Sequence, residues 1–269
     1  MIPIEVIRHR LNSFWGYGSF EAPVWFIGME EGLSGSTDQK QIDIRFQATH
    51  GKVLANIRQD MKLVNGHMKW FTLPYPIQGT IRYPIALYLY LANSRRPDKD
   101  EIRYFQGLRF ADISLKETAA LELMPMPSNS TDPSAWLYRD YAIQGLRLRT
   151  RAEYQDFYKP LRVRELRNLV DKYHPQIVIF YSVTLLRDWQ AVAGIGFDEI
   201  TRQMYFGKRK GTSFCVIPQG NARGMSNDRL FQYADLIKPR LNLTELGRCV
   251  SEKRFQSRPA DIRLRPLGR

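Results

Sequence analysis

A short apolar run that ends in two adjacent glutamates places the strongest constraint on how this chain folds. Residues 23–28 are apolar apart from the terminal glycine, and Gly28-Met29-Glu30-Glu31-Gly32 completes the segment. A continuous apolar run of this length is typical of a parallel strand that is buried on both faces. In open α/β sheets, ligands bind at the carboxyl ends of such strands. The segment therefore predicts an α/β fold with two carboxylates at one sheet edge, where they can activate a water molecule.

Three further apolar runs have the same character, and helical patterns separate them. Strands are predicted at residues 119–124, 177–181 and 213–217, with helices at 2–14, 45–62, 82–93, 98–109, 185–193 and 230–241. Strands that alternate with helices favour a parallel sheet with right-handed crossovers. We therefore expect one three-layer α/β domain over residues 1–245, with a central, mainly parallel four-stranded sheet flanked by helices. A basic tail over residues 246–269 would follow it.

The charge of the chain indicates its class of partner. Forty Lys and Arg residues against 27 Asp and Glu give a net charge of +13, which favours a nucleic acid over a neutral ligand. The two cysteines, Cys215 and Cys249, are too few for a disulfide framework or a four-thiolate metal site, so neither a metal nor a cofactor is expected. No apolar run approaches roughly 18 residues, the length of a membrane-spanning helix. We expect a cytoplasmic, monomeric DNA-binding protein that does not contact a membrane.

Three of the predicted strands end in unusual loops. Gly28–Gly32 follows the first strand, a Pro-Met-Pro-Ser-Asn segment at 125–129 follows the second, and Pro-Gln-Gly-Asn-Ala-Arg-Gly-Met-Ser at 218–226 follows the last. The carboxyl ends of parallel strands lie at one edge of a sheet. The three loops are therefore expected to line one cleft, although they are far apart in the sequence.

The order of these loops resembles the uracil-DNA glycosylase superfamily. In that family a Gly-Gln-Asp-Pro-Tyr type loop follows the first strand, and a His-Pro-Ser type loop follows the last. Phe46 and Gly51, with Val53-Leu54 after them, also resemble a segment of the branch that carries an iron–sulfur cluster. This chain departs from the family in three ways: Gln219 stands where the histidine falls, the prolines of both family loops are absent at the matching places, and two cysteines cannot hold a cluster.

The resemblance implies a monofunctional DNA glycosylase. Such an enzyme flips a pyrimidine out of the base stack and hydrolyses its N-glycosidic bond, leaving an abasic site, in base-excision repair or in defence against bacterial viruses. Glu30 aligns with the family's water-activating aspartate, and Glu31 is the second candidate. Gln219 and Asn221 would donate hydrogen bonds to the leaving base in place of the family's histidine. The ordinary alternatives are that Glu31 pairs with a basic residue and that the two amides serve a turn.

Other positions are expected to bind the base and the DNA backbone. Phe46 would stack on the flipped base, and Asn129 or Glu122 would read its edge, although a core aromatic and a buried Glu–Arg pair are the alternatives. The predicted DNA contacts are Gln78, Thr80, Arg82, Arg223 and Ser226. Arg223 falls where the family places a wedge that enters the duplex, but an arginine equally suits a phosphate.

Gly32 bears on the choice of substrate. It occupies the position of a family tyrosine that excludes substituents at C5 of the pyrimidine, so a larger base would fit. A 5-modified pyrimidine, such as hydroxymethylated or glucosylated cytosine, is therefore a candidate beside uracil. Two other functions remain open: a catalytically silent protein that recognises modified or damaged DNA, and a glycosidase for small nucleosides. The charge of +13 argues against the second of these, because a mononucleotide needs few cations.

Overall fold

The computed structural model describes residues 2–33, 39–128, 132–142, 145–220 and 222–241, and the predicted basic tail lies outside them. One mixed sheet of eight strands runs through the molecule in the order β3-β1-β4-β2-β5-β8-β7-β6. The strands are β1 Gly16–Gly18, β2 Val24–Glu30, β3 Leu54–Ala55, β4 Thr118–Met124, β5 Ile177–Phe180, β6 Asp198–Thr201, β7 Met204–Arg209 and β8 Thr212–Val216. The α-helices are α1 Ile4–Ser13, α2 Gln39–Thr49, α3 Gly79–Asn93, α4 Lys99–Leu108, α5 Arg151–Tyr173, α6 Leu186–Ala193 and α7 Asn227–Ile237.

The four predicted strands form the parallel centre of this sheet, in the order β4-β2-β5-β8. The expectation of only four strands is wrong, because β1 and β3 extend one edge while β6 and β7 extend the other. These edge strands carry little apolar signal. β3 has two residues, β1 reads Gly-Tyr-Gly, and β6 is largely exposed. Only strands buried on both faces need the continuous apolar runs that made the central four visible.

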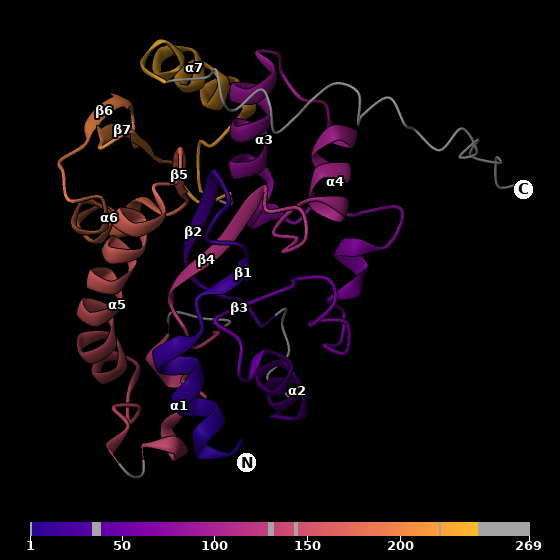
Figure 1. The fold of residues 1–269 in the computed structure, drawn as a ribbon, viewed down its shortest axis with the longest axis vertical. Coiled ribbons are helices and arrows are strands. Elements are labelled where there is room, and N and C mark those ends of the chain that lie inside the picture. Colours follow the sequence, from indigo (N-terminus) through magenta and orange to yellow (C-terminus); the bar gives the residue numbers. More distant parts are fainter. Residues whose placement is uncertain (1, 34–38, 129–131, 143–144, 221, 242–269) are drawn as a thin grey trace, which may run out of the picture.

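Helices cover both faces of the sheet, as the predicted three layers require. Figure 1 shows α5 and α6 on one side of the central strands and α3 and α4 on the other. The buried residues divide in the same way, into one cluster with α3, α4 and α7 and a second with α1, α2, α5 and α6. Alternate residues of β2 belong to opposite clusters: Val24 and Phe26 to the first, Trp25 and Ile27 to the second.

One predicted helix is misplaced. The periodicity over residues 45–62 predicts a single helix, but α2 begins at Gln39 and ends at Thr49. Gly51 has a φ of +77°, which a residue without a side chain adopts at little cost, and the chain then turns into β3. Beyond Gly51, Ala55 and Met61 are buried in the core from a strand and a turn, whereas Val53 is exposed.

The order of the central strands locates a crevice. β2 is the first of the four along the chain, yet it lies between β4 and β5. The connection from β2 leads to β4 on one side, and the connection from β4 then crosses to β5 on the other side of β2. Such a reversal leaves a crevice at the carboxyl ends of the strands, where ligands of open α/β sheets bind. β2 extends further than expected, because Glu30 pairs with Met124 of β4 and so belongs to the strand and not to the turn. None of the helices in the described ranges is long and apolar enough to cross a membrane.

Candidate active site at the carboxyl ends of the parallel strands

Glu31 is held on both of its carboxylate oxygens. Oε2 accepts a hydrogen bond from Nη2 of Arg10 at 2.6 Å, while Oε1 accepts from Tyr17 Oη at 2.6 Å and from Nη1 of Arg45. Burial alone would raise the pKa of Glu31, but Arg45, Arg10 and the Tyr17 hydroxyl outweigh it and hold that pKa at about 2. The carboxylate is thus ionised at neutral pH, and both of its oxygens accept hydrogen bonds. The structure thus agrees with the alternative that Glu31 pairs with basic residues.

Arg10 connects this pair to the loop after β4. Its Nε donates to the Pro125 carbonyl and its Nη1 to Thr49 Oγ1, each at 2.9 Å. The backbone of the same loop bonds the loop after β2, since Ser128 N donates to Glu31 O at 2.9 Å. The structure therefore brings together the loops after the first two predicted strands.

Glu30 has a different environment, although it is the neighbouring residue. Its Oε1 accepts a hydrogen bond from Nη2 of Arg151, the first residue of α5, while its buried Oε2 has no partner among the described residues. Burial raises the pKa of Glu30, and Arg151 offsets that effect in part. Nη1 of Arg151 also lacks a hydrogen-bond partner there, and its guanidinium lies 5.9 Å from the centre of the Trp136 ring. Glu30 is thus a fixed carboxylate with one free oxygen.

Glu122 adds a third carboxyl group to the cluster. Its Oε1 accepts from Tyr181 Oη at 3.4 Å, and its buried Oε2 has no partner in the described part of the chain. Burial raises the pKa of Glu122 well above its usual range, and the charges of Glu31 and Glu30 raise it further. Gly28 lies opposite in the strand register, where a Cβ would come within 2.6 Å of Glu122 Oε2. Because Gly28 has no side chain, the carboxyl group of Glu122 can occupy the space beside it.

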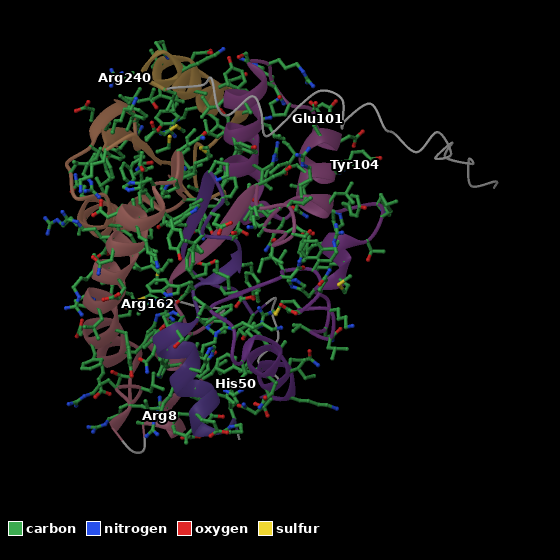
Figure 2. All side chains as sticks on the ribbon, viewed as in Figure 1. Arg8, His50, Glu101, Tyr104, Arg162 and Arg240 are labelled. Atoms are coloured by element: carbon green, nitrogen blue, oxygen red, sulfur yellow. The ribbon has the colours of Figure 1, made fainter. Side chains whose placement is uncertain are left out.

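The alternative for Glu122, a buried Glu–Arg pair, does not form through its side chain among the described residues. Arg162 of α5, labelled in Figure 2, donates to the backbone carbonyls of Glu122, Leu123 and Phe14 at 2.9–3.0 Å. Burial lowers the pKa of Arg162 to about 9. The guanidinium thus links α5 to β4 and forms no ion pair with the carboxyl group of Glu122.

Glu122→Gln is expected to increase the free energy of unfolding, by an amount that grows as the pH rises above 4.5. The raised pKa means that the folded protein favours the protonated carboxyl group, so wild-type stability is lost as the pH rises through that pKa. A neutral amide of the same shape avoids this loss. Urea unfolding of both proteins between pH 4 and pH 9 measures the difference. A difference that stays constant over this range would contradict the assignment.

Phe46 and Gly32, both predicted to line a base pocket, have different environments: Phe46 is buried and Gly32 is exposed. Phe46 is only 1% exposed, and its ring is stacked on Tyr138 at 6.0 Å between centres, with Arg10 over it. It is a core aromatic in this structure, and base stacking would require Tyr138 or Arg10 to move. Gly32 is exposed, and a side chain added there would meet no atom of the described residues within 4 Å. Asn129 and Asn221 lie outside the described residues.

The loop after β8 contacts the start of α3, so the predicted DNA contacts come together. A Cβ at Gly220 would overlap the Gly79 carbonyl, and Tyr83 Oη donates to Met225 O at 3.3 Å. Gln78, Thr80 and Arg82 therefore lie beside the loop that carries Gln219 and Arg223, both of them exposed. Ser226 already caps α7, since its side chain accepts from Arg229 N.

The loop after β8 leaves the same edge of the sheet as the loop after β2, because the two strands are parallel and β5 alone separates them. The spacing between adjacent strands places β8 about 10 Å from β2. Basic side chains occur at both ends of the molecule, as Arg8 and Arg240 show in Figure 2, so charge alone does not mark the site.

Comparison with known proteins does not assign this chain to a family. No protein-family model matches the sequence, and no curated protein matches it significantly. Sequence reasoning did not single out Arg10, Arg45, Arg151 or Tyr181 as members of the carboxylate cluster. Nothing in the sequence distinguishes three buried arginines among 40 Lys and Arg residues.

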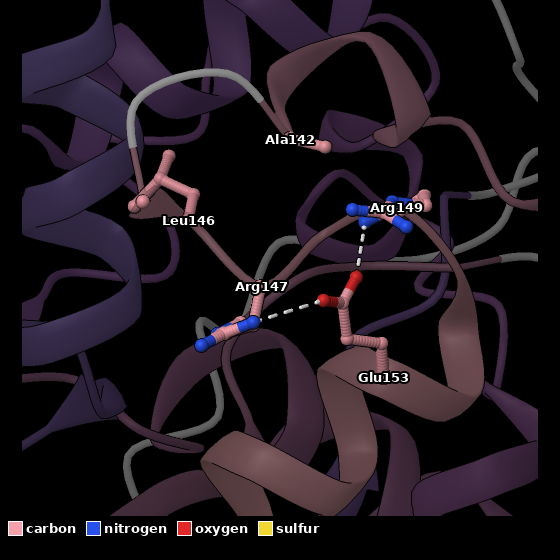
Figure 3. A pocket seen from close by; sticks show the side chains of 6 residues that line it. Ala142, Leu146, Arg147, Arg149 and Glu153 are labelled. Atoms are coloured by element: carbon pink, nitrogen blue, oxygen red, sulfur yellow. Dashed lines mark hydrogen bonds and ion pairs between the residues drawn. The ribbon is translucent and has the colours of Figure 1, made fainter.

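A hollow of about 260 Å³ opens at the start of α5 (Figure 3). Arg147, Arg149 and Glu153 line it, and Glu153 accepts from the backbone N–H of Arg149 at 2.9 Å. Its other oxygen lies 3.7 Å from Nη1 of Arg147. Because Glu153 offsets the positive charge there, the hollow is not a strong anion site. Among the described residues, no three side chains that commonly bind metals are placed to hold an ion.

Proposed function

We propose that this protein is a monofunctional DNA glycosylase, in which Glu30 activates the attacking water. The observation that carries the proposal is the state of Glu30. One oxygen is held by Arg151, and the other is buried without a partner among the described residues, at the carboxyl edge of the sheet where the strand order reverses. Unsatisfied buried polar atoms are rare in folded proteins, and a cluster of them points to a ligand or water.

The chemistry assigns a role to each group. Water adds to C1′ of the sugar, its proton passes to Glu30, and the base departs with the electron pair of the N-glycosidic bond. The positive charge that develops on the sugar is stabilised by the nearby carboxylate. Arg151 is a positioning residue that orients Glu30, and Glu122 offers a carboxyl group to the edge of the base. Gln219 would donate its amide N–H to the leaving base, as expected from the sequence.

The proposed substrate is a pyrimidine in DNA, and the lack of a side chain at Gly32, where the resemblance places a tyrosine, favours one that carries a 5-substituent. The net charge of +13 suits a polyanion. The proposed role is base-excision repair or defence against bacterial viruses whose DNA carries modified bases. The second candidate is a catalytically silent reader of such DNA, and the closed position of Phe46 favours it.

Mass spectrometry of bases released from a panel of DNAs tests the proposal. The panel contains uracil, hydroxymethylcytosine, glucosylated hydroxymethylcytosine and unmodified DNA, each with a control that lacks protein. We expect release of one modified base and an abasic site in its place. No release combined with tight binding would support the silent reader, whereas no release and no binding would reject both functions.

A further inference from the structure

Glu122 lies in a row of three neighbouring positions that crosses the carboxyl ends of β4, β2 and β5. Gly28 of β2 is opposite Glu122 in the strand register, and Tyr181 directly follows the residue of β5 that is opposite Ile27. A Cβ at Gly28 would come within 2.4 Å of Tyr181 Oη and within 2.6 Å of Glu122 Oε2. The glutamate and the tyrosine, which come from different strands, therefore meet over the glycine between them.

The two oxygens of Glu122 have different surroundings. Oε1 accepts a long hydrogen bond from Tyr181 Oη at 3.4 Å, whereas Oε2 has no partner among the described residues. Every other residue of β4 is buried, but Glu122 is partly exposed. Because a hydroxyl group donates to Oε1, a proton on the carboxyl group belongs on Oε2. Glu122 then has an O–H donor without an acceptor in the described part of the chain.

Three carboxyl groups lie at this edge of the sheet, and arginines pair with only two of them among the described residues. Glu31 and Glu30 have arginine partners, whereas no ion pair forms at Glu122 there. Burial raises the pKa of Glu122 well above its usual range, and the charges of Glu31 and Glu30 raise it further. Tyr181 and Arg10 lower that pKa only in part. Since like charges that share a site oppose ionisation, Glu122 is the carboxyl group that retains its proton.

We propose that Glu122 is the general acid of the reaction and gives the proton on Oε2 to N3 of the departing base. The proposal rests on the proposed function for the reaction itself. The bond between C1′ and N1 breaks, its electron pair moves into the ring, and a bond forms between N3 and the proton of Glu122. The base leaves as a neutral molecule, and Glu122 becomes a carboxylate. Glu30 holds the proton from the water, and exchange with solvent restores both groups.

This role selects one class of base. N3 of a 4-amino pyrimidine has a free electron pair, whereas N3 of a 4-keto pyrimidine already carries a hydrogen. After the transfer, the carboxylate of Glu122 can also accept from the exocyclic amine of a 4-amino base, as glutamates do from cytosine. We therefore expect hydroxymethylcytosine to be a better substrate than hydroxymethyluracil, which differs from it only at C4.

The first test measures single-turnover release from pairs of DNAs that differ only at C4 of the target base. The pairs are cytosine with uracil, and hydroxymethylcytosine and glucosylated hydroxymethylcytosine with the corresponding uracils. The 4-amino member of a reactive pair should be released faster, and Glu122→Gln should slow its release about a hundredfold, because an amide cannot give up a proton. Faster release of the 4-keto member, or a Glu122→Gln rate above a third of wild type, would overturn the acid role alone. Wild-type protein that releases no base would overturn the proposed function and the acid role together.

The second test uses the pH profile of the release rate. The wild-type rate should fall on the alkaline side, as Glu122 loses its proton, and the profile of Glu122→Gln should lack this fall. Tyr181→Phe removes a donor that stabilises the carboxylate of Glu122, so the alkaline fall should move to higher pH. Tyr233→Phe is the matched control, because it removes a hydroxyl that donates to Tyr205 O at 2.7 Å, and its profile should match wild type. A Tyr181→Phe profile that coincides with wild type, or an alkaline fall that persists in Glu122→Gln, would overturn the acid role.

Discussion

Replacing Glu31 with alanine is expected to lower the free energy of unfolding by about 3–5 kcal/mol. The substitution leaves Arg10 and Arg45 without their common counter-charge, although these side chains are only 2% and 3% exposed. It also removes the acceptor for the buried Tyr17 hydroxyl. Urea unfolding at pH 7 measures the effect, and Glu21→Ala is the control. Glu21 also pairs with a cation, Lys116, but both side chains are largely exposed, so its loss should change little.

The pH dependence of this difference provides a second check. The pKa of Glu31 is about 2 in the folded protein, against 4.5 for an unperturbed glutamate. A lowered pKa contributes stability that is present above pH 4.5 and is lost as the pH falls toward 2. The difference between wild type and Glu31→Ala should therefore shrink with acidification. A loss below about 1 kcal/mol at pH 7 would mean that the two arginines find other partners or water.

Glu30→Gln is expected to reduce base release by about a thousandfold while the protein stays folded. The amide keeps the shape of the side chain and can accept from Arg151, but it cannot take a proton from water or stabilise a cationic sugar. Single-turnover release of the base identified in the panel measures the rate, with Glu21→Gln as the control for loss of charge at a remote site. DNA affinity should stay within a few-fold of wild type, which separates chemistry from binding.

The pH profile of the wild-type rate should reflect the environment of Glu30. Its pKa is raised by burial, so the rate is expected to fall on acidification at a pH above 4.5. The profile of Glu30→Gln should lack this acidic limb. A Glu30→Gln protein with more than a tenth of the wild-type rate would show that Glu30 does not activate the water.

The central strands were predictable because their burial leaves a direct mark on the sequence. β2, β4, β5 and β8 have helices on both faces, so most of their residues are apolar. The edge strands were not predictable, because β3 and β1 are held by pairing with neighbours and not by apolar runs. The misplaced helix at 45–62 has a related cause: Leu54 and Ile57 match a helical period but pack against the core from β3 and a turn, while Val53 is exposed.

The sequence of Glu30-Glu31 determined that two carboxylates stand at the end of a buried strand. Their different roles could not be read from it, because they are neighbours of the same residue type. Arg10 comes from α1 and Arg45 from α2, and together they neutralise Glu31. Arg151 arrives from α5 and holds one oxygen of Glu30. Electrostatic interactions depend on distance in space and on burial, so the folded arrangement of three helices, and not the local sequence, sets the charge and the freedom of each carboxylate.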